Sequence, residues 1–444
     1  MSTRRAGRAA TSRPAYRAAA ICTPGLEFVC RQELLDLGCT PKSAGLGTVA
    51  FDATPRQLYA ANVWLRTASR VIVRVATFRS TDFVHLERRA AEVDWSAWLA
   101  DGVAPSFRIS SHESRLYHTK AIAQRLHRVA GPPSTGEPEQ LFIVRIDRNT
   151  LTVSVDASGA ALHRRPWRTE LGDAPLRTTM AAALLLAIGW NPETPLLDPF
   201  CGSGTIPIEA ALLARRLPPG GDRSFAFADW PDFQPGAWAS VTGEIAARAE
   251  PSCPAPITAT DRSTAAIAAA RVNAERAGVA DDLELDARVV SHTPARSGTG
   301  LVATNPPYGK RVGDGNLIPL YRRFGAVVRE RLPDWSLAMV CADRKLAKAA
   351  DRGLAPVARF RHGGLPVQLL YRPGREAAEA GTAPARRARS QPAEQATRQA
   401  AQQIAPDGGS AAISDSGSGG RQRGSRDRSP RSRSSSRRSA RAPR

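Results

Sequence analysis

Residues 196–215 read LLDPFCGSGTIPIEAALLAR, and this stretch decides the fold. Leu196–Asp198 is predicted to be a short buried strand, and the apolar spacing after the glycines predicts a helix over Thr205–Arg215. Gly202 and Gly204 lie between the two. Glycine there lets the backbone approach a ligand, and the start of a helix presents free N–H groups. The order of strand, glycine loop and helix predicts an α/β protein that binds a ligand at this loop.

The residues of this loop limit the class of ligand that it can bind. A P-loop would need a lysine, which is missing, and a dinucleotide loop would need a third glycine where Ile206 or Pro207 stands. Asp198 at the strand end would repel a pyrophosphate and suits a cofactor with an ammonium group. S-adenosylmethionine carries such a group and needs no phosphate cradle, so it is the predicted cofactor. The candidate cofactor residues of the loop are Asp198, Phe200, Gly202, Gly204 and Thr205.

Strands and helices continue to alternate through residues 164–373, around a Pro-, Gly- and Trp-rich insertion at 217–256. We expect a helix at Arg177–Ile188, strands at Ile257–Thr260, Leu283–Leu285, Leu301–Ala303 and Ser336–Cys341, helices at Thr264–Ala277, Ile318–Arg331 and Arg344–Ala350, and a closing antiparallel pair at Val357–Arg361 and Val367–Tyr371. This alternation predicts a doubly wound parallel sheet, which binds ligands beyond the carboxyl ends of its strands.

Asn305-Pro306-Pro307-Tyr308 follows one of these strands directly. The Asn305 side-chain oxygen and the following carbonyl are two acceptors that suit the planar NH2 of a nucleobase, and Tyr308 offers a ring for stacking. The prolines remove donors that would compete for those acceptors. A Pro-rich turn leaving a strand is the alternative interpretation. Methyl transfer to an exocyclic amine needs alignment and charge stabilisation, so no histidine or carboxylate pair is required.

Two carboxylates follow the neighbouring strands. Asp261 can take both hydroxyls of a ribose; its alternative role is to cap the helix at Thr264–Ala277, for which Ser263 is also available. Asp286 is a candidate for an adenine amino group, although Asp281 and Asp282 are close and any of the three can be a surface charge.

Residues 16–156 are predicted to form a separate block of short strands and helices, as in small α+β modules. We expect strands at Ala18–Ile21, Val49–Phe51, Val71–Phe78 and Phe107–Ser111, helices at Glu27–Leu37, Pro55–Trp64, Val84–Leu99 and Leu116–Val129, and a hairpin from Leu141–Ile146 to Leu151–Asp156. Trp95 and Trp98 are expected to pack in the core.

The composition points to an anionic partner, because the net charge of the 444 residues is +21. Residues 1–15 read as a disordered basic arm, with a transit peptide as the alternative. From Arg375 the chain becomes rich in Ala, Ser, Gly, Gln and Arg, which predicts a disordered basic tail at 375–444. The six cysteines form no metal-ligand pattern and suggest reduced cytosolic thiols. No apolar run is long enough to span a membrane.

With these motifs in view, the chain resembles class I methyltransferases that modify exocyclic amines in RNA and carry an N-terminal THUMP domain. It is most similar to the bacterial 23S rRNA guanine-N2 methyltransferase group. The supporting stretches are Thr23–Glu27, Ser114–Thr119, Ser158-Gly159 with Leu162–Arg165 and Trp167-Arg168, Ala174–Arg177, Asp198–Thr205 and Asn305–Tyr308. The family usually has Arg-Gly-Tyr-Arg where this chain has Arg165-Pro166-Trp167-Arg168, and a second methyltransferase half found in some members is missing here.

The resemblance implies a ferredoxin-like and THUMP module over 16–156 and a Rossmann-like methyltransferase domain with an antiparallel last strand over 157–374. It implies that the cofactor is held by the loop residues above with Asp261 and Asp286, and the target base by Asn305, Pro306, Pro307 and Tyr308. The implied RNA-binding residues are Arg115, Tyr117, His118, Lys120, Arg164, Arg165 and Arg168. Tyr117 is also a candidate for packing the helix against its sheet, and His118 for a structural role. With Arg125 and Arg128, Arg115 and Lys120 form an expected RNA-facing stripe, or else a solvated face.

The expected function is therefore guanine-N2 methylation of structured RNA, with 23S rRNA favoured. A tRNA guanine-N2 methyltransferase is the closest alternative, followed by a DNA adenine-N6 methylase and a non-catalytic RNA-binding factor. We expect a cytoplasmic, metal-free protein without a membrane partner. A monomer is assumed, because nothing in the sequence defines the oligomeric state.

Overall fold

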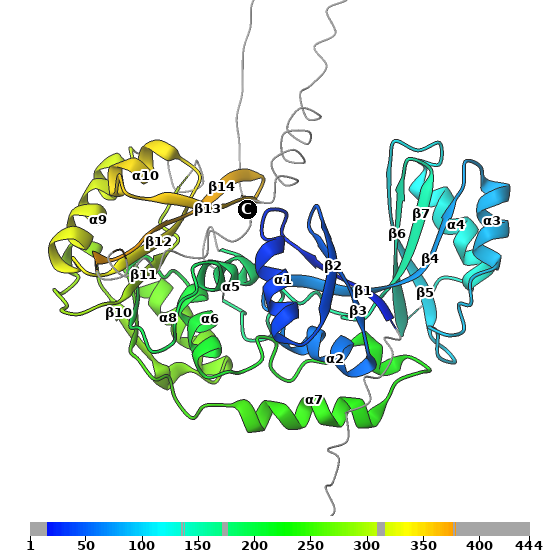
Figure 1. Cartoon of the computed structure of the whole chain (residues 1–444), viewed down its shortest axis with the longest axis horizontal. Helices are drawn as coiled ribbons and strands as arrows, with labels where there is room; N and C mark the ends of the chain where they lie inside the picture. The colour runs from blue at the N-terminus through cyan, green and yellow to red at the C-terminus, as the bar shows by residue number, and fades with distance from the viewer. Residues whose placement is uncertain are drawn as a thin grey trace, which may run out of the picture. The chain divides into compact units, whose positions relative to one another are not determined.

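The computed structural model describes residues 16–134, 136, 138–170, 176–308, 316–375 and 378 (Figure 1). The expected basic arm lies outside these residues. So do Ala174 and Pro175, and the expected tail apart from Arg375 and Ala378. All described residues belong to one compact unit. Within it the chain forms two seven-stranded sheets, one from residues 16–156 and the other from residues 196–372.

The first sheet has the strand order β2-β3-β1-β4-β7-β6-β5. Its strands are β1 (Tyr16–Cys22), β2 (Thr40–Gly45), β3 (Thr48–Ala53), β4 (Ala68–Arg79), β5 (Ala104–His112), β6 (Glu139–Asp147) and β7 (Thr150–Asp156), and its helices are α1 (Glu27–Asp36), α2 (Pro55–Trp64), α3 (Phe83–Ala91) and α4 (Thr119–Ala130). The long strand β4 pairs with β1 through its first half, up to Val73, and with β7 from Ile72 to Arg79, with a bulge between Arg74 and Ala76. A single strand therefore joins both halves of the module.

All four helices pack against the same face of this sheet. Val73 of β4 is level with Ala18 of β1 on one side and with Val155 of β7 on the other, so these side chains share a face. They lie in one core with a residue from each helix, namely Leu34, Leu58, Leu86 and Ile122. The apolar alternation of the strands thus buries one face, and none of these four helices covers the opposite face.

The structure of this module departs from the prediction at three elements, one of them a strand that was not predicted. Strand β2 was not expected, because its sequence TPKSAG is largely exposed at a sheet edge and lacks apolar alternation. The helix expected at 84–99 ends at Ala91, since the Asp94 carboxylate accepts bonds from Ser96 Oγ and Ala97 N and favours a turn. The helix expected at 116–129 begins only at Thr119. Trp95 is buried and Trp98 packs beside it in the same core, as expected.

The insertion between residues 217 and 256 packs onto the first module. Phe227 stacks on Tyr59 of α2 with ring centroids 4.3 Å apart, and Trp230 meets Trp98 edge-on at 5.1 Å. The insertion also contains a helix, α7 (Pro235–Arg248), that the sequence did not predict. Trp238, Val241 and Ile245 of α7 pack against the core of the first module at helical spacing, but the Pro-, Gly- and Trp-rich composition of this segment was read as an insertion.

The second sheet has the order β10-β9-β8-β11-β12-β14-β13. Its strands are β8 (Leu196–Asp198), β9 (Ile257–Asp261), β10 (Leu283–Ala287), β11 (Leu301–Thr304), β12 (Ser336–Cys341), β13 (Ala355–His362) and β14 (Leu365–Arg372), and its helices are α5 (Thr178–Ala187), α6 (Thr205–Ala214), α8 (Thr264–Arg276), α9 (Ile318–Arg331) and α10 (Arg344–Ala350). The first five strands in this order are parallel, and β14 is antiparallel to both of its neighbours. The predicted α/β fold with an antiparallel last strand is confirmed.

The strand order places the predicted motifs together. Neighbouring strands β8 and β11 lie where the chain order reverses, and such a switch point opens a crevice beyond the carboxyl ends of the strands. The glycine loop follows β8, and Asn305–Tyr308 follows β11. Both motifs therefore lie at the same edge of the sheet, beyond the carboxyl ends of two neighbouring strands.

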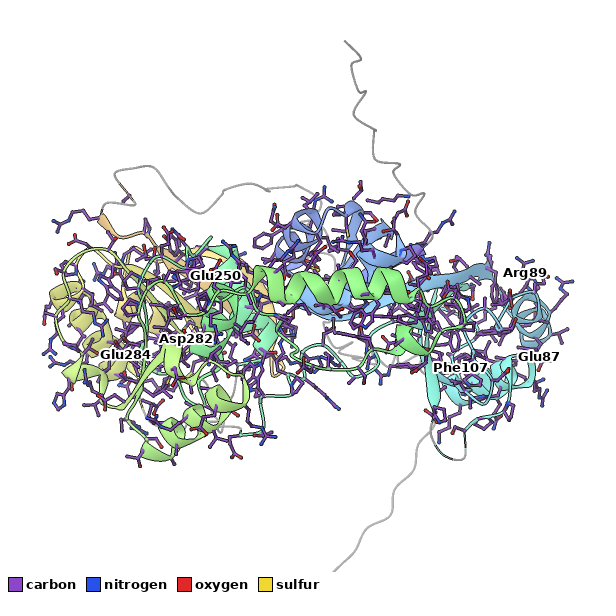
Figure 2. The ribbon with its side chains drawn as sticks, turned by 90° about the horizontal axis from the view of Figure 1, so that it is seen from below. Glu87, Arg89, Phe107, Glu250, Asp282 and Glu284 are labelled. Carbon is purple, nitrogen blue, oxygen red and sulfur yellow. The ribbon has the colours of Figure 1, made fainter. Side chains whose placement is uncertain are left out.

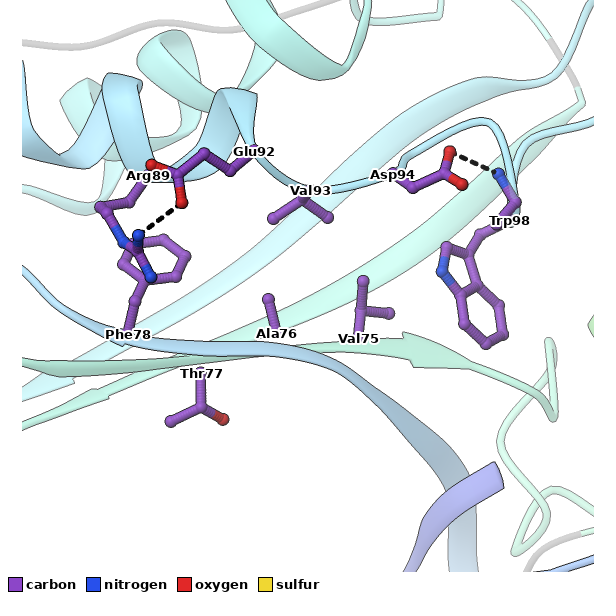
Figure 3. A pocket seen from close by; sticks show the side chains of 10 residues that line it. Val75, Ala76, Thr77, Phe78, Arg89, Glu92, Val93, Asp94 and Trp98 are labelled. Carbon is purple, nitrogen blue, oxygen red and sulfur yellow. Dashed lines mark hydrogen bonds and ion pairs between the residues drawn. The ribbon is translucent and has the colours of Figure 1, made fainter. Parts of the chain in front are cut away.

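A surface pocket of about 240 Å³ lies elsewhere, on the helix-covered face of β4 (Figure 3). It is lined by Val75, Phe78 and Trp98, and the Arg89–Glu92 ion pair closes one side. None of the predicted site residues lines it. We therefore do not connect this pocket with the predicted chemistry.

Candidate functional site

A short hydrogen bond joins the two strands at the switch point. Thr304, the last residue of β11, donates from its hydroxyl to Oδ1 of Asp198 over 2.6 Å, and Phe200 N donates to the same oxygen over 3.1 Å. Asp198 is only 1% exposed. Burial raises the pKa of its carboxyl to about 7, and the charge of Asp261 adds to this, while the two hydrogen bonds oppose it. Asp198 was expected to face a ligand, and in the structure its Oδ1 also holds the two loops together.

The two glycines of the loop have different roles. Gly202 has a φ of +53°, and a Cβ added to it would meet no atom within 4 Å. Gly204 has a φ of +82° and caps α6, but a Cβ there would lie 3.0 Å from the Cβ of Ala270 in α8. Gly202 thus leaves open space beside the backbone, whereas Gly204 allows two helices to pack closely. Thr205, buried, is the first residue of α6.

Asp261 is bonded to the glycine loop. Its Oδ2 accepts from Gly202 N over 3.1 Å, and its Oδ1 accepts from Ser263 N over 3.0 Å. Ser263 caps α8 by accepting from Ala266 N, so Asp261 is not the helix cap. Each carboxylate oxygen can accept a second bond. The carboxylate is therefore held at the crevice with acceptor capacity left for a ligand hydroxyl.

Asp286 stands apart from this bonded cluster. It lies on the edge strand β10, its side chain is half exposed, and it pairs with Arg288 over 2.5 Å. Of the neighbouring acids, Asp282 has a structural role, because it accepts from Cys253 N and pairs with Arg215; Figure 2 marks its place. The structure brings Asp198, Gly202 and Asp261 together but shows no bond that draws Asp286 into that group.

The segment Asn305–Tyr308 carries an unused acceptor. Oδ1 of Asn305 is buried and has no hydrogen-bond partner among the described residues. Its neighbours are fixed: the Pro307 carbonyl accepts from the Tyr321 hydroxyl over 3.1 Å, and the Tyr308 hydroxyl bonds His362 Nδ1 over 3.2 Å. Burial raises the pKa of Tyr308 above its ordinary range, so the phenol is neutral. A buried acceptor without a donor costs about 1–3 kcal/mol, so this position suits an incoming N–H group.

Arg165 was predicted to contact RNA, and this prediction is wrong because its side chain is buried. Its side chain is 1% exposed, and its Nε donates to Oε1 of the fully buried Glu209 over 2.9 Å. The other nitrogens donate to the carbonyls of Leu162 and Arg66. Arg66 belongs to the first module and Glu209 to α6. The pair therefore anchors the first module to the helix that begins at the glycine loop.

The remaining candidate arginines of this segment differ in exposure. Arg164 is exposed. Arg168 is partly buried, and its Nε and one terminal nitrogen are buried without a partner among the described residues. Burial lowers the pKa of its guanidinium.

Around the expected RNA stripe, Arg115, His118 and Lys120 are exposed, in keeping with contact to a partner. Tyr117 is 64% exposed and lies against the ring of His118, with centroids 4.1 Å apart. The packing role considered for Tyr117 is wrong, since Leu116 is the buried residue of this loop. Arg125 and Arg128 both pair with Glu87 of α3 and are not free charges.

Asn273 of α8 was missed by the sequence analysis. It is fully buried, and its amide donates to the Ser203 and Glu170 carbonyls over 3.0 Å each. Its oxygen accepts from Thr169 N and Glu170 N. All of its hydrogen-bonding capacity thus ties the glycine loop to residues 169–170. A polar residue on the apolar face of a predicted helix was the available signal.

Metal and membrane sites are not seen in the described part of the chain. Within it no group of three His, Cys, Asp or Glu side chains has the arrangement of a metal site. The helices described are all too short or too polar to cross a bilayer.

Comparisons with known proteins match two separate parts of the chain to family models. Residues 165–364 match the family described as the RMKL-like methyltransferase domain, and residues 17–72 match the RlmL ferredoxin-like domain. A Synechocystis protein provisionally named an RNA methyltransferase is 31% identical over 81% of this chain and 97% of its own length. The ribosomal RNA large subunit methyltransferase K/L of Alteromonas mediterranea is 32% identical over 78% of this chain. The match covers 52% of that relative, so the chain spans about half its length.

A solved structure resembles most of the chain. The protein SMU.472, provisionally named a methyltransferase and crystallised with S-adenosylhomocysteine, aligns with a TM-score of 0.74 and 28% identity. The alignment covers 81% of this chain and 98% of that protein.

Proposed function

Because this chain belongs to the family of RMKL-like RNA methyltransferases, we propose that it methylates the exocyclic N2 of a guanine in structured RNA. S-adenosylmethionine, the cofactor of this family, supplies an electrophilic methyl group on its sulfonium when bound. The observation that carries the choice of an amine acceptor is the buried, partnerless Oδ1 of Asn305. A buried acceptor at the crevice is suited to a nucleobase NH2.

The residues beside the glycine loop fit the cofactor. Gly202 leaves room for close approach, and the carboxylate of Asp261 has capacity for the ribose hydroxyls. We assign Asp286, which is half exposed and paired with Arg288, to the adenine amino group. Asp198 and Thr205 are the buried residues at the two ends of the loop: Asp198 bonds Thr304, and Thr205 begins α6. Phe200 packs edge-on against Phe324, with ring centroids 5.4 Å apart.

The target amine is held by Asn305 and the carbonyl of Pro306. Accepting its hydrogens there aligns the nitrogen lone pair and stabilises the positive charge that develops as the methyl group transfers. The ring of Tyr308 is kept in place by its bond to His362, so it is positioned for stacking on the base. The Pro307 carbonyl accepts from the Tyr321 hydroxyl, and this bond fixes the backbone between Asn305 and Tyr308.

We assign residues 16–156 to RNA binding as a ferredoxin-like and THUMP module, residues 157–374 to catalysis, and the protein to the cytoplasm. The favoured substrate is 23S rRNA, because a relative with 32% identity is named a ribosomal RNA large subunit methyltransferase. The net charge of +21 suits a nucleic acid partner.

Nucleoside mass spectrometry of purified rRNA and tRNA tests this proposal. We compare a strain lacking the gene with the same strain expressing the wild-type chain or Asn305→Ala. The expected result is loss of one N2-methylguanosine from large-subunit rRNA, restored by the wild type and not by Asn305→Ala. A loss confined to tRNA would make tRNA the substrate in place of rRNA. A lost N6-methyladenosine would overturn the guanine assignment. An unchanged set of nucleosides would refute methyl transfer to RNA.

A further inference from the structure

No helix of the described residues lies on one face of the half-sheet β4-β7-β6-β5. The apolar residues Phe142, Val144 and Ile146 of β6 point to the other face, into the core shared with α3 and α4. The alternate residues Ile143, Arg145 and Asp147 therefore point away from the helices. Figure 3 shows the same division in β4, where Thr77 projects opposite to Ala76 and Phe78.

The strand registers arrange polar side chains in rows across this face. One row contains Thr77, Thr152, Arg145 and Ser110, and the row before it contains Arg74, Ser154, Ile143 and Arg108. A third row runs from Arg79 through Thr150 and Asp147 to His112. The face thus combines arginines with hydroxyl groups. We call Arg74, Arg79, Arg108 and Arg145 the basic face.

The four arginines of the basic face are exposed, and none makes an ion pair or hydrogen bond within the described ranges. The acid at the edge, Asp147, is already engaged by His112 over 3.2 Å and by Arg148. The arginines of α4, on the helix-covered side of the sheet, are paired. Arg125 and Arg128 of α4 pair with Glu87 over 2.9 and 3.1 Å, and the bond to Arg125 lowers the pKa of that carboxyl. The four arginines of the sheet are therefore unpaired, whereas Arg125 and Arg128 of α4 share Glu87, which Figure 2 marks on α3. Lys120, at the start of α4 beside the loop 113–118, is exposed and is not part of this pairing.

The side chains of the basic face indicate which part of an RNA it fits. Sheets that bind single strands stack bases on exposed aromatic rings. Here Phe78, Phe107 and Phe142 all point into the helix-covered core. Arginine and hydroxyl groups without aromatic rings suit phosphates and 2′-hydroxyls, which duplex RNA presents along its backbone.

The predicted RNA-binding loop forms the rim of this face. His112 ends both β5 and the third row, and residues 113–118 follow it. Ser114 Oγ accepts from Asn149 N, and Arg115 N donates to the Asn149 side chain, so the loop is fastened to the β6–β7 turn. Arg115 and the exposed Tyr117 therefore continue the surface at its edge.

We propose that the basic face binds the phosphate backbone of duplex RNA, and that the paired arginines of α4, Arg125 and Arg128, do not carry this contact. The proposal rests on the proposed function, in which RNA is the substrate. It names the surface that holds the RNA, outside the crevice where methyl transfer takes place.

The test compares two double variants of the full chain that each remove two positive charges. Arg108→Thr with Arg145→Thr alters the basic face and keeps residues that favour strands. Arg125→Gln with Arg128→Gln is the matched control on α4 and keeps residues that favour helices. Binding of a fluorescein-labelled RNA hairpin is followed by anisotropy over a series of salt concentrations. Thermal unfolding and calorimetric binding of S-adenosylmethionine confirm that each variant is folded.

The basic-face variant is expected to bind more weakly and to lower the salt slope by about 2, since each phosphate contact contributes about 1. The α4 variant is expected to keep the wild-type slope. An unchanged slope in the basic-face variant, or an equal fall in both variants, would overturn the proposal. If Arg108→Thr with Arg145→Thr fails to fold, Arg74→Thr with Arg79→Thr is tested against the same expectation.

Methyl transfer to rRNA from the gene-deletion strain, measured on the same proteins, separates the two proposals. A wild-type chain that binds the hairpin through the basic face but transfers no methyl group would refute the proposed function and leave the surface standing. Normal transfer by the wild type together with an unchanged slope in the basic-face variant would refute the surface alone.

Discussion

The hydroxyl of Thr304 and the carboxylate of Asp198 lie 2.6 Å apart, and this bond joins the strand before Asn305 to the strand before the glycine loop. Both groups are buried. A buried hydrogen bond to a carboxylate is sensitive to small changes, because either partner left alone loses the compensation for its burial. The distance between the two motifs therefore depends on a residue outside both.

Thr304→Val should loosen this connection. Valine keeps the shape of threonine but cannot donate, so Asp198 loses its shortest bond and the free energy of unfolding should fall by about 1–3 kcal/mol. The affinity for S-adenosylmethionine should fall as well, because the glycine loop follows Asp198. Urea unfolding and calorimetry measure the two effects. Thr304→Ser keeps the hydroxyl and should resemble the wild type; equal behaviour of the valine and serine variants would contradict this role.

The raised pKa of Asp198 predicts a pH dependence of stability. An unfolded aspartate titrates near about 4, whereas the folded carboxyl titrates at about 7. Between these values the folded chain holds a proton that the unfolded chain has lost, so this contribution to stability falls as the pH rises and levels off above about 7.

Asp198→Asn isolates that contribution, since asparagine can still accept from Thr304 and Phe200 but does not titrate. The free energy of unfolding of the variant minus that of the wild type should increase with pH up to about 7 and then remain constant. Urea unfolding at a series of pH values gives this difference. A difference that is flat with pH, or that decreases, would show that Asp198 is ionised throughout.

Asn305→Ala should separate activity from stability. The Asn305 oxygen has no donor in the described structure, so its removal should not lower the free energy of unfolding. Methyl transfer should fall by about 100-fold or more, as when an oxyanion donor is removed from other enzymes. Cofactor binding should survive. A variant that retains full activity would remove Asn305 from the chemistry.

Asn273→Ala should have the opposite profile. The substitution removes four buried hydrogen bonds, each worth about 1 kcal/mol net, so the chain should lose several kcal/mol of stability. Because Ser203 loses its tie to α8, cofactor affinity should also fall, with the turnover of saturated enzyme less affected. Asn305→Ala is the matched control for removing an asparagine amide. Cofactor affinity equal to the wild type would limit Asn273 to a role in stability.

Much of the fold could be predicted because local signals agree with it. Helix α9 and strand β12 begin and end where expected, since an apolar period, a proline at the second helical position and a short apolar run all mark them. Strand β2 was missed because it is an exposed edge strand that buries no apolar row. Helix α7 was missed although Trp238, Val241 and Ile245 have helical spacing, because the surrounding Pro-, Gly- and Trp-rich composition was read as an insertion.

The site was predictable in part for the same reason. Once the strands are predicted, the polar residues at their carboxyl ends become candidates, and Asp261 and Asn305 were selected in this way. The partners of those residues depend on strand order, which the sequence does not state. Thr304 meets Asp198 only because β11 lies beside β8. Arg165 looked like an RNA contact because its buried partner, Glu209, lies on a helix further along the chain.

The buried pair Arg165 and Glu209 predicts that Arg165 stabilises the fold and does not contact RNA. Arg165→Met leaves the Glu209 carboxylate buried without its close partner and should cost about 3–5 kcal/mol of stability. Adding Glu209→Leu should restore most of the loss, because two apolar side chains of similar volume can fill the same space. Arg66 lies 3.9 Å from Glu209 but also donates to the Leu212 and Leu217 carbonyls, so it keeps partners in the double variant. If Arg165 only anchors the first module to α6, the double variant should bind the RNA hairpin with the wild-type salt slope. A slope lowered by about 1 would instead make Arg165 an RNA contact.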